Sequence, residues 1–435
     1  MKNLLIGTAF MVVANSSAIA YELTDLGANI EPRAINNLGV VVGSSNTDQY
    51  PSSAFRWSSA QGMELITGTS ANAVNDNGQI AGSTITGAFV LDGNNYREWS
   101  DYDAFGINQA GSAAGYNVGN NPYQPRSLPY NPAIYDGNQW NVFDIANLYP
   151  RGTRDGVYAD RFILNSINDY GYSVGYKYRY GLAGSSAILI APDARIKDST
   201  DVTYLSVPAG GKASDINNSN LIVGTTGSTQ AYVLDYNTGN LATLPLLDGG
   251  LRSSAYDINE YDQVVGSSET LDGSSLVNHA VLWDQANGVI TDLNTWAPVD
   301  WILESATAVN DNGDIAGTGY LNGVPHGFLL TNGVAPVPPP AQNQQPVAVA
   351  SADTHAGKAP LVVTFDSSGS TDPDGNIVEY SWDFMDGNSS TDQNPVHVFT
   401  APGSYLVTLT VTDDQGMKGT SAIDITVRKG KGNNK

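Results

Sequence analysis

A short pattern recurs seven times in this 435-residue chain: an Asn, a turn residue three positions later, and a Gly seven positions later. The residue before the Asn is Ile or Val in every copy. The turn residue is Gly five times, Asn220 once and Asp262 once, and these residue types best tolerate a positive φ. The pattern therefore predicts seven tight β-hairpins, each with an Asn that caps its own turn. The copies start at Asn36, Asn75, Asn108, Asn168, Asn217, Asn259 and Asn310.

A third apolar strand follows each hairpin, and a looser fourth strand often comes after it. Four strands in about 45 residues is the size of a propeller blade. Glu22–Leu26, ahead of the first hairpin, resembles such a fourth strand, whereas the seventh unit has none after Leu330. We therefore expect Glu22–Leu26 to pair with the strand around Phe328–Leu330. That pairing would close a ring of units and remove two sheet edges.

The predicted fold class is all-β, with a seven-bladed β-propeller-like repeat domain over residues 21–333. The alternatives are another number of blades or an open β-solenoid, although no capping units are evident at the two ends. The seven in-register units resemble the HAF-type extracellular repeat family. This resemblance implies export and a repeat fold rather than a particular reaction.

A different pattern follows a Pro-rich linker at residues 334–345, which is typical of an extended spacer. The segments Phe365–Gly375, Tyr380–Gly387 and Pro402–Tyr405 occur in this order. On these segments, residues 346–428 resemble a PKD domain. The resemblance implies a C-terminal immunoglobulin-like β-sandwich that is not itself catalytic and acts as a spacer or a second binding unit.

Within this second domain, we expect Trp382 to lie in the core of the sandwich. Met385 stands where the family usually has Gly, so its turn is expected to be slightly altered. The basic tail at residues 429–435 is expected to be disordered. Some PKD-like domains bind calcium, so calcium is the one cofactor considered, although Asp-Pro-Asp-Gly is also an ordinary turn sequence. The calcium candidates are Asp372, Asp374 and Asp413.

The N-terminus has the features of a secretory signal peptide over residues 1–20. Lys2 precedes an apolar stretch, and Ala18-Ile19-Ala20 fits the small-x-small cleavage pattern, which predicts cleavage after Ala20. The chain has no cysteine, which excludes disulfides, thiolate nucleophiles and a lipidated N-terminal Cys. We expect a protein that is secreted or held at the cell surface, or alternatively one that is periplasmic.

The formal net charge is −23 at pH 7, with a sequence pI near 4.2. Such a chain repels phosphate backbones and anionic membrane surfaces, so we expect neither nucleic-acid binding nor membrane insertion. No stretch beyond the N-terminus is apolar for long enough to span a bilayer. The predicted partner is an extracellular glycan or a surface protein.

No common catalytic or nucleotide-binding motif occurs in the sequence, and the chain has only four histidines. His279 and His326 both precede the third strand of their units, in a position that other units fill with Ser, Gly, Pro or Gln. A position that tolerates these residues favours a structural role. The alternative is that one of the two histidines is a catalytic base.

Residues 121–180 interrupt the repeat and contain ten of the chain's 23 tyrosines. The interval between successive repeat asparagines stretches to 60 residues here, against 33 to 51 elsewhere. Tyr can stack on sugar rings and Arg can bind a carboxylate or sulfate with two hydrogen bonds, although tyrosines could also cover a neighbouring unit. The ligand-binding candidates are Tyr123, Arg126, Tyr130, Arg151, Arg154, Tyr158, Arg161, Tyr176 and Arg179.

Together these features favour an exported, non-enzymatic binding or adhesion protein. Its propeller would recognise a glycan or a protein. The alternative is a secreted enzyme, a lyase of an acidic polysaccharide, in which Arg would neutralise a uronate and Tyr or His would move the proton. The position of His279 and His326 relative to the central channel would discriminate between these two functions.

Overall fold

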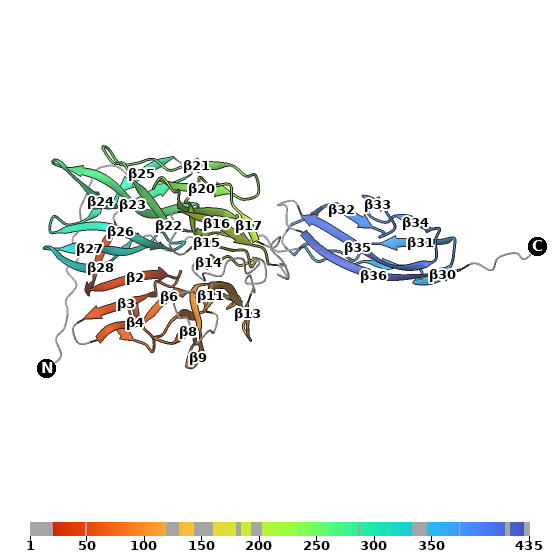
Figure 1. The fold of residues 1–435 in the computed structure, drawn as a ribbon, viewed down its shortest axis with the longest axis horizontal. Coiled ribbons are helices and arrows are strands. Elements are labelled where there is room, and N and C mark those ends of the chain that lie inside the picture. Colours follow the sequence, from red (N-terminus) through yellow and green to blue (C-terminus); the bar gives the residue numbers. More distant parts are fainter. Residues whose placement is uncertain are drawn as a thin grey trace, which may run out of the picture. The chain divides into compact units, whose positions relative to one another are not determined.

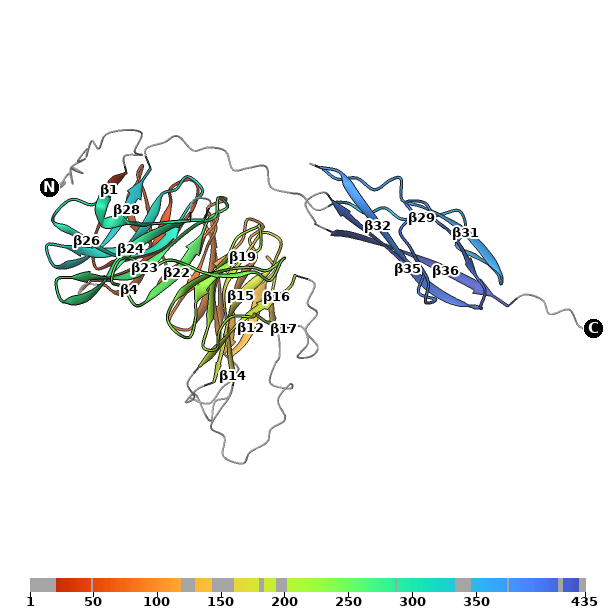
Figure 2. The ribbon, with the colours of Figure 1, turned by 90° about the horizontal axis from the view of Figure 1, so that it is seen from above.

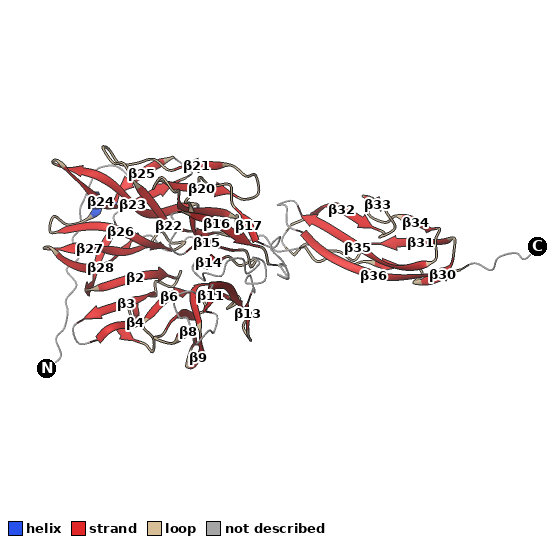
Figure 3. Ribbon diagram, in the orientation of Figure 1, coloured by secondary structure: helices blue, strands red, loops and turns tan. Residues whose placement is uncertain are grey.

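The chain divides into two compact domains, Met1–Pro338 and Pro339–Lys435, in this computed structural model. Both are built from β-strands (Figures 1 and 3). Within the described residues the only helix is a short 3-10 helix, η3 (Leu293–Trp296). The chain is all-β, as predicted. The structure describes residues 21–47, 50–118, 130–142, 160–179, 184–192, 202–285, 288–332, 346–373, 375–413 and 418–429.

The N-terminal domain contains one group of strands for each sequence repeat, numbered here as units 1 to 7. Within a unit, strands that are consecutive in sequence are antiparallel neighbours. Unit 1 contains β2 (Ile30–Ile35), β3 (Val41–Thr47), β4 (Tyr50–Ser58) and β5 (Gly62–Leu65); unit 2 contains β6 (Ser70–Val74), β7 (Ile80–Ser83), β8 (Gly87–Asp92) and β9 (Asn95–Ser100); unit 3 contains β10 (Tyr102–Ile107), β11 (Ala113–Val118), β12 (Tyr130–Tyr135) and β13 (Trp140–Val142); unit 4 contains β14 (Asp160–Ile167), β15 (Ser173–Arg179), β16 (Ser185–Ile190) and β17 (Val202–Tyr204); unit 5 contains β18 (Lys212–Ile216), β19 (Leu221–Thr225), β20 (Ala231–Asp235) and β21 (Leu241–Thr243); unit 6 contains β22 (Ser253–Ile258), β23 (Gln263–Asp272), β24 (Ser275–Asp284) and β25 (Val289–Asp292); unit 7 contains β26 (Trp301–Val309), β27 (Ile315–Leu321), β28 (Val324–Thr331) and β1 (Glu22–Ala28).

Five of these units are separate four-stranded sheets, whereas units 3 and 4 share one eight-stranded sheet. The two are joined where β12 and β14 run parallel, through the single pair Tyr130 and Arg161. The enlarged interval in the sequence therefore falls between two units that are themselves regular.

The repeat turns have the backbone conformation that the sequence predicts. The middle residue has positive φ in all seven copies, including Asn220 and Asp262 at 60° each and Gly313 at 78°. In each turn the Oδ1 atom of the repeat Asn also accepts a hydrogen bond from the N–H four residues later, as Asn310 does from Asp314 at 2.8 Å. Both features confirm the predicted Asn-capped turn.

The second Gly of the repeat is required for a steric reason that the sequence does not reveal. A Cβ atom on Gly317 would overlap the carbonyl oxygen of Ser305 on the facing strand, and it would lie 2.6 Å from the ring of Phe328. The corresponding Gly of every other unit meets a backbone oxygen of the facing strand in the same way. Any side chain here would push the first two strands of the unit apart.

The N-terminal strand completes the last unit. β1 pairs antiparallel with β28, with Leu23 opposite Leu330 and Asp25 opposite Phe328 (Figure 2). This is the predicted pairing of Glu22–Leu26. Leu26 is buried and packs in a cluster that also contains residues of units 1 and 7.

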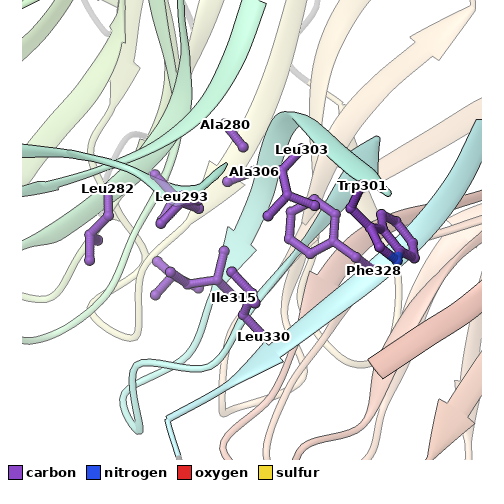
Figure 4. Packing of buried hydrophobic residues seen from close by; sticks show 11 residues of the cluster. Ala280, Leu282, Leu293, Trp301, Leu303, Ala306, Ile315, Phe328 and Leu330 are labelled. Carbon is purple, nitrogen blue, oxygen red and sulfur yellow. The ribbon is translucent and has the colours of Figure 1, made fainter. Parts of the chain in front are cut away.

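Apolar layers fill the spaces between neighbouring units. One cluster joins Leu282 of unit 6 and Leu293 of η3 to Leu303, Ile315 and Phe328 of unit 7, all of them buried (Figure 4). Complete burial of one such side chain stabilises a fold by about 1.5–3 kcal/mol. The units are therefore held together by packing between sheets as well as by the backbone.

The C-terminal domain is a β-sandwich of two sheets (Figure 2). Trp382 is fully buried between them beside Phe365 and Phe399, which confirms its predicted core position. Met385 has φ 57°, the left-handed region in which the family's usual Gly is favoured. One sheet contains β29 (Ser351–Ala352), β31 (Leu361–Asp366) and β34 (Val396–Phe399); the other contains β30 (Ala356–Lys358), β36 (Lys418–Arg428), β35 (Gly403–Asp413), β32 (Ile377–Asp383) and β33 (Ser389–Ser390).

Candidate functional site

The first strand of each repeat unit carries a β-bulge at the same place. In all seven units the pairing with the second strand skips the residue three positions before the repeat Asn, and in unit 7 it also skips Glu304. A bulge leaves its residue outside the ladder and redirects the side chain. We call these seven residues the bulge ring. They are Arg33, Asn72, Phe105, Asn165, Ser214, Tyr256 and Thr307.

The bulge ring lies between two adjoining cavities. All seven residues line a narrow cavity of about 270 Å³, whose wall includes residues from the first strand of every unit. All except Ser214 also line a mouth cavity of about 640 Å³ on the side of Asn29 and His326. We refer to the two cavities together as the channel. Its size suits a small-molecule or sugar ligand.

Three members of the bulge ring are fixed by hydrogen bonds to the next unit. Asn72 Nδ2 donates to the carbonyl oxygen of Ala104 at 2.7 Å, and Asn165 Nδ2 donates to that of Ala213 at 2.8 Å. Thr307 Oγ1 donates to the carbonyl oxygen of Pro32 at 2.8 Å. These bonds hold the side chains in place before any ligand arrives, which is what a preorganised site requires.

The other large members offer two aromatic faces and one cation. Phe105 stacks on Tyr116 with ring centroids 5.8 Å apart, and Tyr256 remains 40% exposed. Arg33 is 44% exposed at its side chain, with Nη2 3.6 Å from Glu31 Oε2. An exposed ion pair of this length contributes little to stability, so Arg33 is accessible to a ligand.

The repeat asparagines form a closed ring of hydrogen bonds at the turn end of the channel. The Nδ2 atom of each buried Asn donates to the backbone carbonyl oxygen of the repeat Asn in the next unit, at 2.8–3.2 Å. The last bond returns from Asn310 to Asn36. The order of donation is Asn36, Asn75, Asn108, Asn168, Asn217, Asn259, Asn310 and again Asn36.

A second closed ring is formed by the residues that follow these asparagines, which we call the turn ring. The backbone N–H of each member donates to the side chain of the next member at 2.7–3.1 Å. Four of the seven side chains are carboxylates, so this end of the channel is acidic. The turn ring consists of Asn37, Asp76, Gln109, Asp169, Asn218, Glu260 and Asp311.

The acids on the channel wall perturb one another. Burial, together with the charges of Asp311, Asp169 and Asp215, raises the pKa of Glu260 to about 8, although a hydrogen bond from the Asn218 N–H opposes this. Burial and the neighbouring Asp215 also raise the pKa of Asp257 well above its usual range.

Asp215 and Asp257 also tie neighbouring units together. Asp215 Oδ2 accepts from the Ile258 N–H at 3.0 Å, and Asp257 Oδ2 accepts from the Val309 N–H at 2.7 Å. The channel wall between units 5 and 7 thus carries two carboxyl groups, those of Asp257 and Glu260, whose pKa values are raised.

The two histidines of the repeat domain bind aspartates on the adjoining fourth strand. His279 Nδ1 lies 2.7 Å from Asp292 Oδ2, and His326 Nδ1 lies 2.8 Å from Asp25 Oδ1. These matching contacts favour the structural role. Only His326 lines the mouth cavity, together with Arg33, whereas His279 lines neither cavity.

The tyrosines and arginines singled out from residues 121–180 are not part of this channel where the structure describes them. Arg161 is buried in β14, with Nη1 3.3 Å from the hydroxyl of Tyr178. Tyr176 packs under Lys212, whose Nζ lies 4.6 Å from the ring centroid. Tyr130 and Arg179 belong to strands β12 and β15. Tyr123, Arg126, Arg151, Arg154 and Tyr158 lie outside the described residues.

The calcium candidates remain a prediction. Asp372 lies between β31 and β32 and Asp413 is buried at the end of β35, while Asp374 lies outside the described residues. Within the described ranges, no three His, Asp or Glu side chains form a group that could hold a metal ion. No helix in that part of the chain has the length and hydropathy of a membrane span.

Sequence analysis missed the bulge ring. The residue before the repeat Asn is always Ile or Val, and the residue before that is mostly small. The third position before the Asn varies from Arg33 to Phe105 and Ser214, but the position two residues after the Asn varies as widely, from Leu38 to Tyr170. Variation in the motif therefore does not distinguish the bulge position from an exposed turn position.

Comparison with known proteins identifies the second domain. Residues 343–427 match the family model described as PKD domain. Collagenase ColQ1 from Bacillus cereus (strain Q1) is 52% identical over 68 residues, which is 16% of this chain and 7% of the collagenase. Pre-pro-metalloprotease PrtV from Vibrio cholerae is 60% identical over 47 residues, 11% of this chain and 5% of that protein. The chain thus covers only a small part of the length of these relatives.

Two solved structures are similar to parts of the chain. The PKD1 domain from Vibrio cholerae metalloprotease PrtV is 42% identical and covers 20% of this chain and 100% of that chain, with a TM-score of 0.18. An oligogalacturonate lyase in complex with manganese is 10% identical and covers 75% of this chain and 97% of that chain, with a TM-score of 0.45. The second similarity is too distant to indicate an activity. Residues 343–427 of this chain are a PKD domain.

Proposed function

We propose that this chain is an exported binding protein whose repeat domain is a closed seven-bladed β-propeller of HAF-type units that binds a glycan in its channel. The PKD domain acts as a spacer or a second binding unit. The observation that carries this proposal is the bulge ring, since seven bulges at one repeat position supply six different residue types to the same channel.

The chemistry of the bulge ring suits a sugar. Phe105 and Tyr256 lie on units 3 and 6, well separated around the ring, and aromatic faces stack on the apolar faces of pyranose rings. The amides of Asn72 and Asn165 and the hydroxyl of Thr307 offer donors and acceptors for sugar hydroxyls. Concave sites with aromatic walls and a few fixed polar groups are the usual form of small-ligand sites.

A glycan array probed with purified residues 21–435 tests this proposal. We expect binding to at least one glycan, and the double variant Phe105→Ala, Tyr256→Ala should weaken it about ten-fold or more, since two stacking contacts are lost. Tyr204→Ala, an exposed aromatic outside the channel, is the matched control and should bind normally. Equal binding by the double variant and the wild type would exclude the channel as the site.

A second candidate function is a lyase of an acidic polysaccharide. One observation favours it: His326, paired with Asp25, lines the mouth cavity together with Arg33. The carboxylates on the channel wall count against it, because they repel a uronate. The test is to incubate polygalacturonate with the protein and follow the absorbance of new unsaturated ends, which His326→Ala should abolish.

A further inference from the structure

The charge of the channel restricts the kind of sugar that can bind in it. Among the described residues that line the two cavities, Arg33 is the only Lys or Arg, and Glu31 lies beside it. Six lining residues carry carboxyl groups. They are Glu31 and Glu304 in the mouth cavity and Asp169, Asp215, Asp257 and Glu260 in the narrow cavity.

From this lining we infer that the glycan bound in the channel carries free amino groups, as in a partly or fully deacetylated polymer of amino sugars. This inference rests on the proposed glycan-binding function and specifies its ligand class. In this inference the carboxyl groups on the channel wall bind the ammonium group, and the aromatic rings of Phe105 and Tyr256 contact the sugar ring.

The contacts available in the channel fit an ammonium-bearing sugar. An ammonium donates three hydrogen bonds and is bound strongly by carboxylates in a site with little water. It is also attracted to the face of an aromatic ring such as Tyr256 or Phe105. Both kinds of group line the narrow cavity together with the amides of Asn72 and Asn165.

An acidic sugar would meet the opposite conditions. Its carboxylate would lose water while facing several like charges, and Arg33 is the one Arg or Lys on the described lining that could compensate. A neutral N-acetylated sugar would avoid this repulsion but would leave the wall carboxyl groups without a cationic partner. The deacetylated sugar is therefore the favoured ligand of the three.

The acids around Glu260 provide an independent readout. Its carboxyl group lies among Asp311, Asp169 and Asp215, whose charges help to raise its pKa. Asp257 and Asp215 form the neighbouring acidic pair. An ammonium bound among these groups offsets their repulsion and lowers the pKa of Glu260. At pH 6, where the amine of the free sugar is already mostly protonated, binding should therefore release protons.

The test is calorimetric titration of residues 21–435 with three tetrasaccharides, which are the tetramers of glucosamine, of N-acetylglucosamine and of galacturonate. At pH 6 in low salt, where the amines are mostly protonated, we expect the glucosamine tetramer to bind about ten-fold or more tightly than the N-acetylated one, because charged hydrogen bonds are gained. We expect no measurable binding of galacturonate. Two buffers of different ionisation enthalpy should reveal proton release for glucosamine alone.

Two single variants test whether the channel carboxyl groups cause the preference for the free amine. Glu260→Gln should reduce the preference for the free amine several-fold, whereas Glu64→Gln, on β5 and paired with Arg56 outside the channel, should leave it unchanged. Preference for the N-acetylated or the galacturonate tetramer would overturn the charge inference and leave the proposed glycan function standing. If none of the tetramers bound and the glycan array were also negative, the proposed function itself would fall.

Discussion

Each repeat asparagine uses both ends of its side-chain amide. In unit 7, Asn310 Oδ1 accepts from the N–H of Asp314 at 2.8 Å, and Nδ2 donates to the carbonyl oxygen of Asn36 at 3.0 Å. Aspartate could make the first bond but has no donor for the second. This double role explains why Asn begins all seven copies, whereas the middle turn position accepts Gly, Asn or Asp.

The middle turn position gives a prediction at the same scale. Gly313 has φ 78°, a conformation that a β-branched residue strains, so Gly313→Val should lower the free energy of unfolding of the repeat domain by about 1–3 kcal/mol. Urea denaturation measures this. Ser219→Val changes an exposed residue one position earlier in the turn of unit 5 and is the control. An unchanged denaturation midpoint for Gly313→Val would contradict the role assigned to the turn.

At the scale of the element, the sequence predicts the hairpins well and the bulges not at all. The turn geometry depends on residues within one short segment, so Asn220 and Asp262 could be assigned positive φ from their residue types alone. A bulge is a property of the pairing between two strands, and the residue types of Phe105 and Tyr256 do not indicate one. The channel, which joins the first strands of seven units, was for the same reason missed as the candidate site.

The turn ring gives a prediction for the dependence of stability on pH. The pKa of Glu260 is about 8 in the folded protein against an ordinary value of 4.5, so the folded state binds more protons between these two values. The free energy of unfolding should therefore fall as the pH rises from about 5 to 9. Asp257, whose pKa is also raised, acts in the same direction.

Glu260→Gln tests how much of the pH dependence of the free energy of unfolding comes from this one residue. The variant has no carboxyl group to ionise, so its free energy of unfolding should change less between pH 5 and pH 9 than that of the wild type. Chemical denaturation at several pH values measures the difference. Glu64→Gln, on an outer strand, should keep the wild-type slope. An identical slope in Glu260→Gln and the wild type would contradict the raised pKa.

At the scale of the whole molecule, several contacts join the start of the repeat domain to its end, and three of them show how it is assembled. β1 pairs with β28, Asn310 donates to Asn36, and the backbone N–H of Asp311 donates to Asn37. Only the first was foreseeable, because a strand without its own hairpin stood at the N-terminus. The two side-chain contacts depend on a geometry that exists only once all seven units are assembled.

The β1 contact carries the last prediction. Deleting residues 21–27 removes the strand opposite Leu330 and Phe328, exposes the edge of β28 and takes buried Leu26 out of the core shared by units 1 and 7. We expect the melting temperature of the repeat domain to fall by about 10 °C or more and aggregation to increase. The PKD domain has its own core, so its separate melting transition should stay in place. Deleting residues 430–435 is the matched control and should change neither transition. If the two deletions gave the same melting curve, β1 would not close the ring, and the side-chain contacts between units 7 and 1 would have to hold it without the strand.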